Sequence, residues 1–202
     1  PVEYNVAPLV HKPYMTWGLS LAMAALFLNQ LLTGTLEATV GNWGFIPNEW
    51  FRHNGLTILT SFFLHGGVFH ILSNLYFFVI FGDNVEDFLG HRRYLLFYLL
   101  SGVGANLIFL LFSPATMTPL VGASGAIAGV MGAYFILFPG ARILTLVPIF
   151  LFITVVELPA YFFLGFWFIL QFLFGTFSSL GPGAAAGGVA PTEIEPARAL
   201  IL

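Results

Sequence analysis

The sequence predicts an all-α polytopic membrane protein, and three observations support this fold class. Of its 202 residues, 58% are hydrophobic and only 7% are charged, whereas about a quarter of the residues in soluble domains are charged. The six Lys and Arg and nine Asp and Glu side chains could not cover the surface of a soluble globule of 22.1 kDa. Several uncharged stretches approach the roughly 20 residues that a helix needs to cross a bilayer. A water-soluble fold is therefore excluded.

Three long apolar spans are expected in the first half of the chain. Residues 14–32 carry no charge and form the first span. Residues 36–56 mix charges, tryptophans and a proline, so we expect an extended loop at the membrane interface. Residues 65–82 form a second span, whose two histidines and asparagine are costly in hydrocarbon unless they face the bundle interior. Residues 81–93, with three acids and two arginines, predict a loop before the third span at 94–112.

The second half is less regular. Residues 124–138 predict a short fourth span of about 22 Å, which needs other helices around it because it cannot cross a bilayer alone. A fifth span is expected at 158–174, which leaves 143–156 as an apolar connection or a partly inserted segment. Small residues at 181–190 begin a sixth helix, and the prolines and charges of 191–202 stop it. The sixth helix is therefore expected to be incomplete.

These spans define the expected organisation: an N-terminal cytoplasmic segment at 1–13, a transmembrane domain at 14–190 and an atypical polar tail at 191–202. The positive-inside rule favours a cytoplasmic N-terminus, because only Arg52 then lies in an outer segment before the tail. The inner segments hold Lys12, Arg92, Arg93 and Arg142. No secretory signal peptide is expected, because the first span is too long for one.

Composition also limits the chemistry. The chain contains no Cys, which excludes disulfides, a thiol nucleophile and a Cys-built zinc site. The net charge of −3 with scattered basic residues offers no stripe for nucleic acid. Any catalysis must therefore use Ser, Thr, His or carboxylates.

Ser124 is the candidate nucleophile. It lies in the segment Gly122-Ala123-Ser124-Gly125, where an uncharged turn becomes an apolar helix. The free N–H groups and positive dipole of a helix start stabilise an oxyanion formed by attack of the hydroxyl. A simple Ser N-cap between packing glycines remains the alternative. The segment is not the GxSxG elbow of α/β-hydrolases, because Ala126 occupies the last position.

Two histidines, an asparagine and two aspartates are the other polar residues that could take part in chemistry. His70 and Asn74 are four apart, within about 40° on one helix face, so they predict a pair of oxyanion donors; interhelical hydrogen bonding is the alternative. His65 lies five residues before His70, about 140° around a helix, so no shared metal is expected. Asp83 and Asp87 are interpreted as solvated charges of a loop, not as an acid–base pair.

A glycine seam follows the candidate nucleophile. Gly125, Gly129 and Gly132 recur along the fourth span at the spacing of a helix-packing face. We expect the small residues at 181–190 to be its partner.

Six segments in order resemble the rhomboid intramembrane serine proteases over nearly the whole chain. These are WGFIP at 43–47, HGGVFHILSNLYFF at 65–78, FGDNVEDFLG at 81–90, YLLFYLLSG at 94–102, VGASGAIAGVMGAY at 121–134 and LPAYFFLGFWFILQ at 158–171. The resemblance implies a six-helix bundle with a water-filled active site and no cofactor. It makes Ser124 the nucleophile, His70 and Asn74 the oxyanion pair, and Gly122 and Gly125 motif glycines.

The resemblance fails at the dyad histidine, which the family carries in an A-H-x-x-G pattern on its sixth helix. Here GGVA at 187–190 is followed by PTEIEPARALIL, and the last histidine is His91. Serine is a weak nucleophile without an adjacent base, so the chain as written is expected to be nearly inactive. A truncated or frame-shifted chain, an expression tail and a non-catalytic family member are three explanations. The abrupt change at Pro191 favours the first two.

The resulting hypothesis is an intramembrane serine endopeptidase whose substrates are single-pass transmembrane proteins, with the lipid bilayer as its other partner. The alternative is a non-catalytic rhomboid-like membrane protein that binds transmembrane clients. A transporter is disfavoured, because neither an intramembrane carboxylate nor an inverted repeat is evident.

Overall fold

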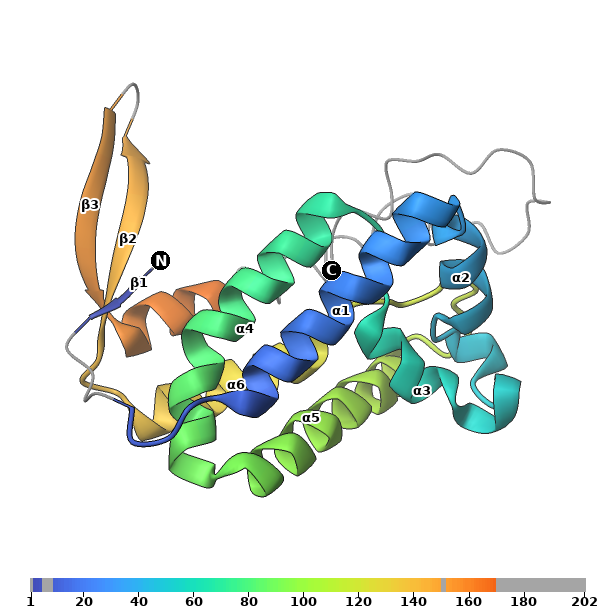
Figure 1. The fold of residues 1–202 in the computed structure, drawn as a ribbon, viewed down its shortest axis with the longest axis horizontal. Helices are drawn as coiled ribbons and strands as arrows, with labels where there is room; N and C mark the ends of the chain where they lie inside the picture. The colour runs from blue at the N-terminus through green and yellow to red at the C-terminus, as the bar shows by residue number, and fades with distance from the viewer. Residues whose placement is uncertain (1, 5–8, 150–151, 170–202) are drawn as a thin grey trace.

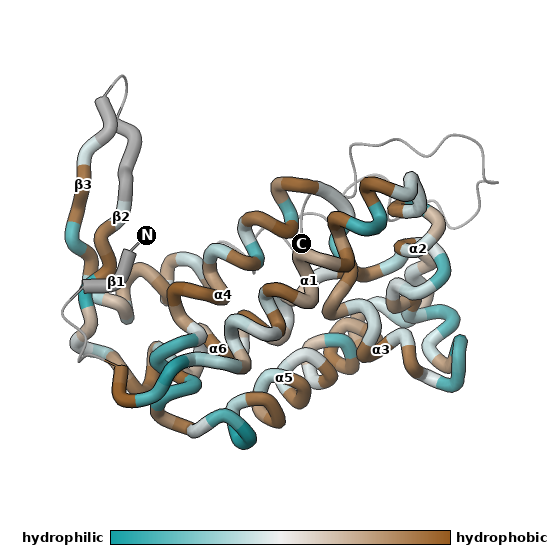
Figure 2. Tube along the Cα trace, in the orientation of Figure 1, coloured by the Kyte–Doolittle hydropathy of each residue, from teal (hydrophilic) through white to brown (hydrophobic). Residues whose placement is uncertain are grey.

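The computed structural model describes residues 2–4, 9–149 and 152–169, which form a helical bundle with a projecting β-hairpin (Figure 1). Within these described residues, three helices are long and apolar enough to cross a membrane: α1 (Tyr14–Thr33), α4 (Val68–Leu89) and α5 (His91–Phe112). The shorter α6 (Ser124–Leu137) packs against α4 and α5. In Figure 2 hydrophilic residues gather around the α4–α5 junction and in the α2–α3 region, with apolar helices between. The predicted helical membrane fold is confirmed.

The segment between α1 and α4 is more regular than the expected loop. It folds into short helices, namely α2 (Leu36–Trp43), η1 (Pro47–Glu49), η2 (Arg52–Gly55), α3 (Thr57–Thr60) and η3 (Ser61–Phe63). Arg52 donates hydrogen bonds to the carbonyls of Gly41 and Gly44 at 3.0 and 2.8 Å. Trp43 stacks on His53 with ring centroids 4.3 Å apart. These contacts tie the end of α2 to η2.

The predicted loop at 81–93 is wrong. Helix α4 continues to Leu89 and α5 begins at His91, so only Gly90 separates them, with a φ of 76°. The acids of this stretch therefore lie on the last turns of α4 and not in a solvated loop. Asp87 accepts hydrogen bonds from the backbone N–H groups of Val10 and His11, both at 2.8 Å, and from Nδ1 of His11. The chain before α1 satisfies this charge.

Glu86 explains why a helix with acids at its end is stable here. Its side chain is fully buried and accepts bonds from the N–H groups of Met15 and Thr16 at 2.8 Å, from the Thr16 hydroxyl at 2.7 Å and from Nδ1 of His91 at 2.6 Å. Helix α1 has Pro13 at its N-cap position and no side-chain cap of its own. A carboxylate from α4 therefore caps α1 and joins it to the start of α5.

The glycine seam on α6 packs against α5. A Cβ added at Gly125 would lie 2.5 Å from the Ala105 methyl, and one at Gly129 would collide with the Ser101 side chain. Among the described residues, nothing lies within 4 Å of a Cβ added at Gly132. The packing function of the seam is confirmed for its first two glycines, with α5 as their partner. The expected partner, 181–190, lies outside the described residues.

Two paired strands, β2 and β3, lie where the sequence predicts an apolar connection or a partly inserted segment at 143–156. Strand β2 (Arg142–Ile149) pairs antiparallel with β3 (Phe152–Pro159), and β1 (Val2–Tyr4) pairs with the first three residues of β2. The helix of the predicted fifth span, a different element from α5, covers Ala160–Ile169 and begins close to the expected position. We call it the fifth helix. The remainder of the predicted fifth span, the sixth helix and the tail at 191–202 lie outside the described residues.

Candidate functional site

Ser124 is the first residue of α6, as the sequence predicts, and its side chain is half-buried. The preceding segment is fixed by backbone bonds: Phe45 and Leu120 exchange two, at 2.9 and 2.7 Å, and the N–H of Gly122 donates to the carbonyl of Ser61 at 2.9 Å. The N-cap residue Ala123 supplies no side-chain cap. The first N–H groups of α6 therefore lie beside Ser124 without a capping side chain.

His70 lies against the turn that precedes Ser124. A Cβ added at Gly122 would be 2.6 Å from Nε2 of His70 and 2.9 Å from its Cε1. Gly122 also has a φ of 118°, which other residues rarely adopt. Both the backbone conformation and the imidazole therefore require glycine at this position. The structure brings together His70 and the GASG segment, which the sequence connects only by residue type.

Asn74 is buried on the next turn of α4. Its amide donates to the carbonyl of His70 at 2.8 Å, a bond within its own helix. No described contact joins Asn74 to Ser124. His70 and Asn74 both lie on α4, four residues apart, and their pairing as oxyanion donors stays a prediction.

His65 is closer to His70 than the helical spacing suggests. The two rings meet edge-on with centroids 5.2 Å apart. An angle of 140° applies only if both residues lie in one helix, but α4 begins at Val68 and His65 lies in the segment before it. Burial, together with the neighbouring His70, lowers the pKa of His65 to about 4, so it is neutral at pH 7. Within the described residues, no three His, Asp or Glu side chains converge as metal ligands would.

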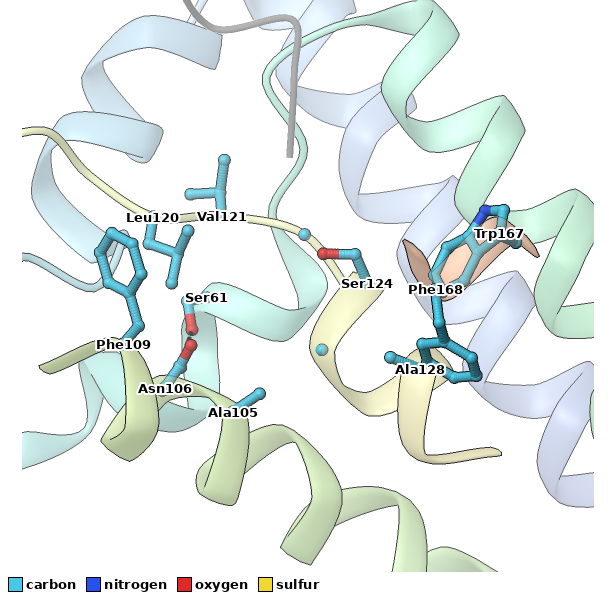
Figure 3. Close-up of a pocket in the computed structure, with 12 residues that line it drawn as sticks. Ser61, Ala105, Asn106, Phe109, Leu120, Val121, Ser124, Ala128, Trp167 and Phe168 are labelled. Atoms are coloured by element: carbon cyan, nitrogen blue, oxygen red, sulfur yellow. Dashed lines mark hydrogen bonds between the residues drawn. The ribbon is translucent and has the colours of Figure 1, made fainter. Parts of the chain in front are cut away.

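A cavity of about 230 Å³ adjoins Ser124 (Figure 3). It lies between η3, α5, α6 with the segment before it, and the fifth helix (Ala160–Ile169). Its lining residues are Ser61, Ala105, Asn106, Phe109, Leu120, Val121, Gly122, Ser124, Gly125, Ala128, Trp167 and Phe168. Figure 3 shows Ser124 between the Leu120–Val121 segment and the aromatic side chains of Trp167 and Phe168. Neither His70 nor Asn74 is among these described lining residues.

The cavity contains two polar residues that the sequence analysis missed. Asn106 is buried and donates to Oγ of Ser61 at 3.0 Å and to the carbonyl of Ile58 at 2.9 Å. Asn106 could have been found, because an amide within an apolar span is costly unless it faces the interior. Ser61 offered no comparable signal. The pair gives the mostly apolar cavity one hydrogen-bonded polar wall.

Comparison with known proteins agrees with this architecture. The family model described as "Rhomboid domain" matches residues 47–190. The chain belongs to the rhomboid family. This match includes α4, α5, α6 and the whole cavity lining, and the family is integral to membranes.

Three relatives illustrate the similarity. RHOMBOID-like protein 1 of Arabidopsis thaliana is 39% identical over 82 residues, 41% of this chain and 21% of that protein. The "Putative rhomboid protease YdcA" of Bacillus subtilis is 37% identical over 93 residues, 46% of this chain and 44% of its own length. Rhomboid protease GluP of the same organism is 39% identical over 85 residues, 42% and 15% of the two chains. The chain thus spans less than half the length of these relatives.

Proposed function

We propose that this chain carries the nucleophile and oxyanion site of an intramembrane serine endopeptidase that cleaves single-pass transmembrane proteins. The observation that carries the proposal is the position of Ser124, at the start of α6, where no described side chain caps the helix, and on the wall of a cavity. Membership of a family that includes proteins named as proteases supports it.

In the proposed reaction, Oγ of Ser124 attacks the substrate carbonyl carbon and its proton passes to a base. The carbonyl oxygen becomes an oxyanion, which the N–H groups at the start of α6 stabilise. His70 and Asn74 are proposed to donate further hydrogen bonds. When this tetrahedral intermediate collapses, the carbonyl re-forms, the peptide C–N bond breaks and the base returns the proton to the departing amine. Water then attacks the acyl-enzyme ester, releases the new carboxylate and restores the Ser124 hydroxyl. The close approach of His70 to Gly122 supports its assignment, while the amide of Asn74 would have to exchange its bond to the His70 carbonyl.

The base is the missing part. No histidine follows His91 in the 202 residues, and His91 itself is bonded to Glu86 at the α4–α5 junction. His65 is near His70, but a group whose pKa burial lowers to about 4 is a poor acceptor for a serine proton. We therefore expect this chain, taken alone, to be nearly inactive.

The proposed function also sets two requirements for the substrate. A transmembrane helix hides its amides in hydrogen bonds between residues i and i−4, so the scissile segment must unwind locally. Clients with helix-breaking or small residues near the cleavage point are expected. The mostly apolar walls of the cavity suit an apolar side chain beside the scissile bond.

The experiment uses a fluorophosphonate probe and a model transmembrane substrate in proteoliposomes. The 202-residue chain is expected to label poorly and not to cleave. Replacing residues 191 onward with a complete small-residue helix carrying A-H-x-x-G should restore both activities. Ser124→Ala should then abolish them, and the control Ser113→Ala, in the turn after α5, should not.

Two outcomes would change the conclusion. Ser124-dependent cleavage by the unmodified chain would show that another group acts as the base, with His65→Ala the first variant to test. If the restored chain neither labels nor cleaves but still retains the substrate on co-purification, the non-catalytic alternative, a rhomboid-like protein that binds transmembrane clients, is favoured. The lack of a histidine after His91 is the observation behind that alternative.

A further inference from the structure

In the part of the chain that the structure describes, the β2–β3 hairpin leaves the helical bundle and contacts it at its base. The strands pair along their whole length, from Arg142↔Pro159 to Ile149↔Phe152, and eight residues extend about 25 Å. At the base Ile143 is fully buried and the N–H of Ala160 donates to the carbonyl of Ala141 at 2.8 Å. Beyond the base the hairpin projects away from the helices (Figure 1).

The sequence of the projecting part is unsuited to water. Residues 143–156 read ILTLVPIFLFITVV, with no charge and only Thr145 and Thr154 polar. On β3 the side chain of Val155 is 61% exposed. An apolar surface of this kind needs an apolar environment.

Charge on the hairpin is confined to its base. Arg142 and Glu157 lie 3.5 Å apart with about half of each side chain exposed. Lys12, just before α1, and Arg92 and Arg93, in the first turn of α5, are exposed. Figure 1 shows the start of α1 and the α4–α5 junction at the end of the bundle from which the hairpin leaves. The acids of α4 at this end are engaged within the protein, as Glu86 and Asp87 show. Exposed basic side chains next to an apolar surface complement the headgroups of an anionic lipid surface.

We propose that the β2–β3 hairpin rests on the lipid bilayer, with its apolar residues at the boundary between headgroups and acyl chains. The fifth helix follows β3 directly and continues this surface, because its exposed side chains are also apolar. They are Tyr161, Phe162, Phe166 and Ile169. The hairpin does not cross the membrane: unpaired N–H and C=O groups along the open edge of β3 would each cost several kcal/mol in hydrocarbon. At the interface water satisfies these groups.

The test measures the depth of single labels, which the absence of native Cys permits. Val155→Cys, near the middle of β3, and Glu157→Cys, near its base, are coupled to an environment-sensitive fluorophore. Vesicles contain phosphatidylcholine with brominated acyl chains and phosphatidylglycerol. Phe162→Cys on the fifth helix is the lipid reference, and the same fluorophore on glutathione is the water reference.

The Val155 label should be quenched by the brominated lipid about twofold more than the Glu157 label, close to the Phe162 reference. Aqueous iodide should rank the labels in the reverse order. Accessibility of position 155 to iodide equal to that of the glutathione conjugate would place the hairpin in water and overturn the proposal. Protection from both quenchers that disappears on dilution with lipid would assign the hairpin to a second copy of the chain, which also overturns it. Thr154→Cys serves if Val155→Cys lowers the Tm in detergent.

Discussion

Replacing Glu86 with Gln tests whether one buried carboxylate holds α1, α4 and α5 together. Gln has nearly the same size, so packing is retained, but one carboxylate oxygen becomes an NH₂ donor. Oε1 of Glu86 accepts from Met15 and His91, and Oε2 accepts from the backbone and hydroxyl of Thr16. Whichever oxygen is replaced, one backbone N–H at the start of α1 then faces a donor.

The expected cost follows from these four bonds. A buried N–H left without an acceptor costs about 1–3 kcal/mol, and the remaining bonds lose the strengthening that the negative charge gives them. We expect Glu86→Gln to lower the free energy of unfolding by about 3 kcal/mol. For a chain of this size the corresponding fall in Tm is about 6–12 °C.

The assay is thermal unfolding in detergent micelles, followed by circular dichroism. Glu37→Gln is the matched control, because Glu37 is exposed in the first turn of α2. Its Tm should stay within about 1 °C of the parent. If Glu86→Gln unfolds at the same temperature as this control, the capping of α1 by Glu86 contributes nothing measurable and the reasoning is refuted.

Three further predictions concern the contacts of Gly122, the burial of His65 and the packing of α5 on α6. Gly122→Ala should cost about 2 kcal/mol and reduce probe labelling of the restored chain, because it strains a φ of 118° and displaces His70. Gly18→Ala, at an exposed position of α1 with no described atom within 4 Å of the added methyl, should lower neither stability nor labelling. Stability should fall as the pH drops from about 6.5 to about 4, by up to about 3 kcal/mol, because the unfolded chain protonates His65 while burial keeps the folded ring neutral, its pKa lowered to about 4. A Tm titration of His65→Gln that shows the same loss would exclude His65 as the cause. Gly129→Ala should destabilise the α5–α6 contact by about 1–3 kcal/mol, and Ser101→Gly in the same chain should recover part of this loss in Tm; no recovery would mean that the two residues do not share the contact.

The membrane class and the main helices follow from the amino-acid sequence alone. A chain with so few charges can hide its surface only in lipid, and the uncharged stretches at 14–32 and 94–112 match α1 and α5 within a few residues. The start of α6 at Ser124 was also predictable, because a glycine-bounded turn precedes an apolar run. Because an imidazole is costly in hydrocarbon, the sequence alone also predicts that His70 faces the interior of the bundle.

Tertiary structure alone decided the features that depend on partners distant in sequence. The acids of 81–93 predict a loop only if water must solvate them, and Glu86 is instead satisfied by the N–H groups of α1, about 70 residues earlier in the chain. Residues 143–156 are apolar without a clear period, so their sequence does not distinguish a strand from an inserted segment. Only the pairing of β2 with β3 identifies the strands. The edge contact of His65 with His70 arises because His65 lies outside α4. In each case the sequence indicates that exposing or burying a group is unfavourable. The contact that stabilises the group comes from a residue outside the local segment, so the local pattern cannot predict it.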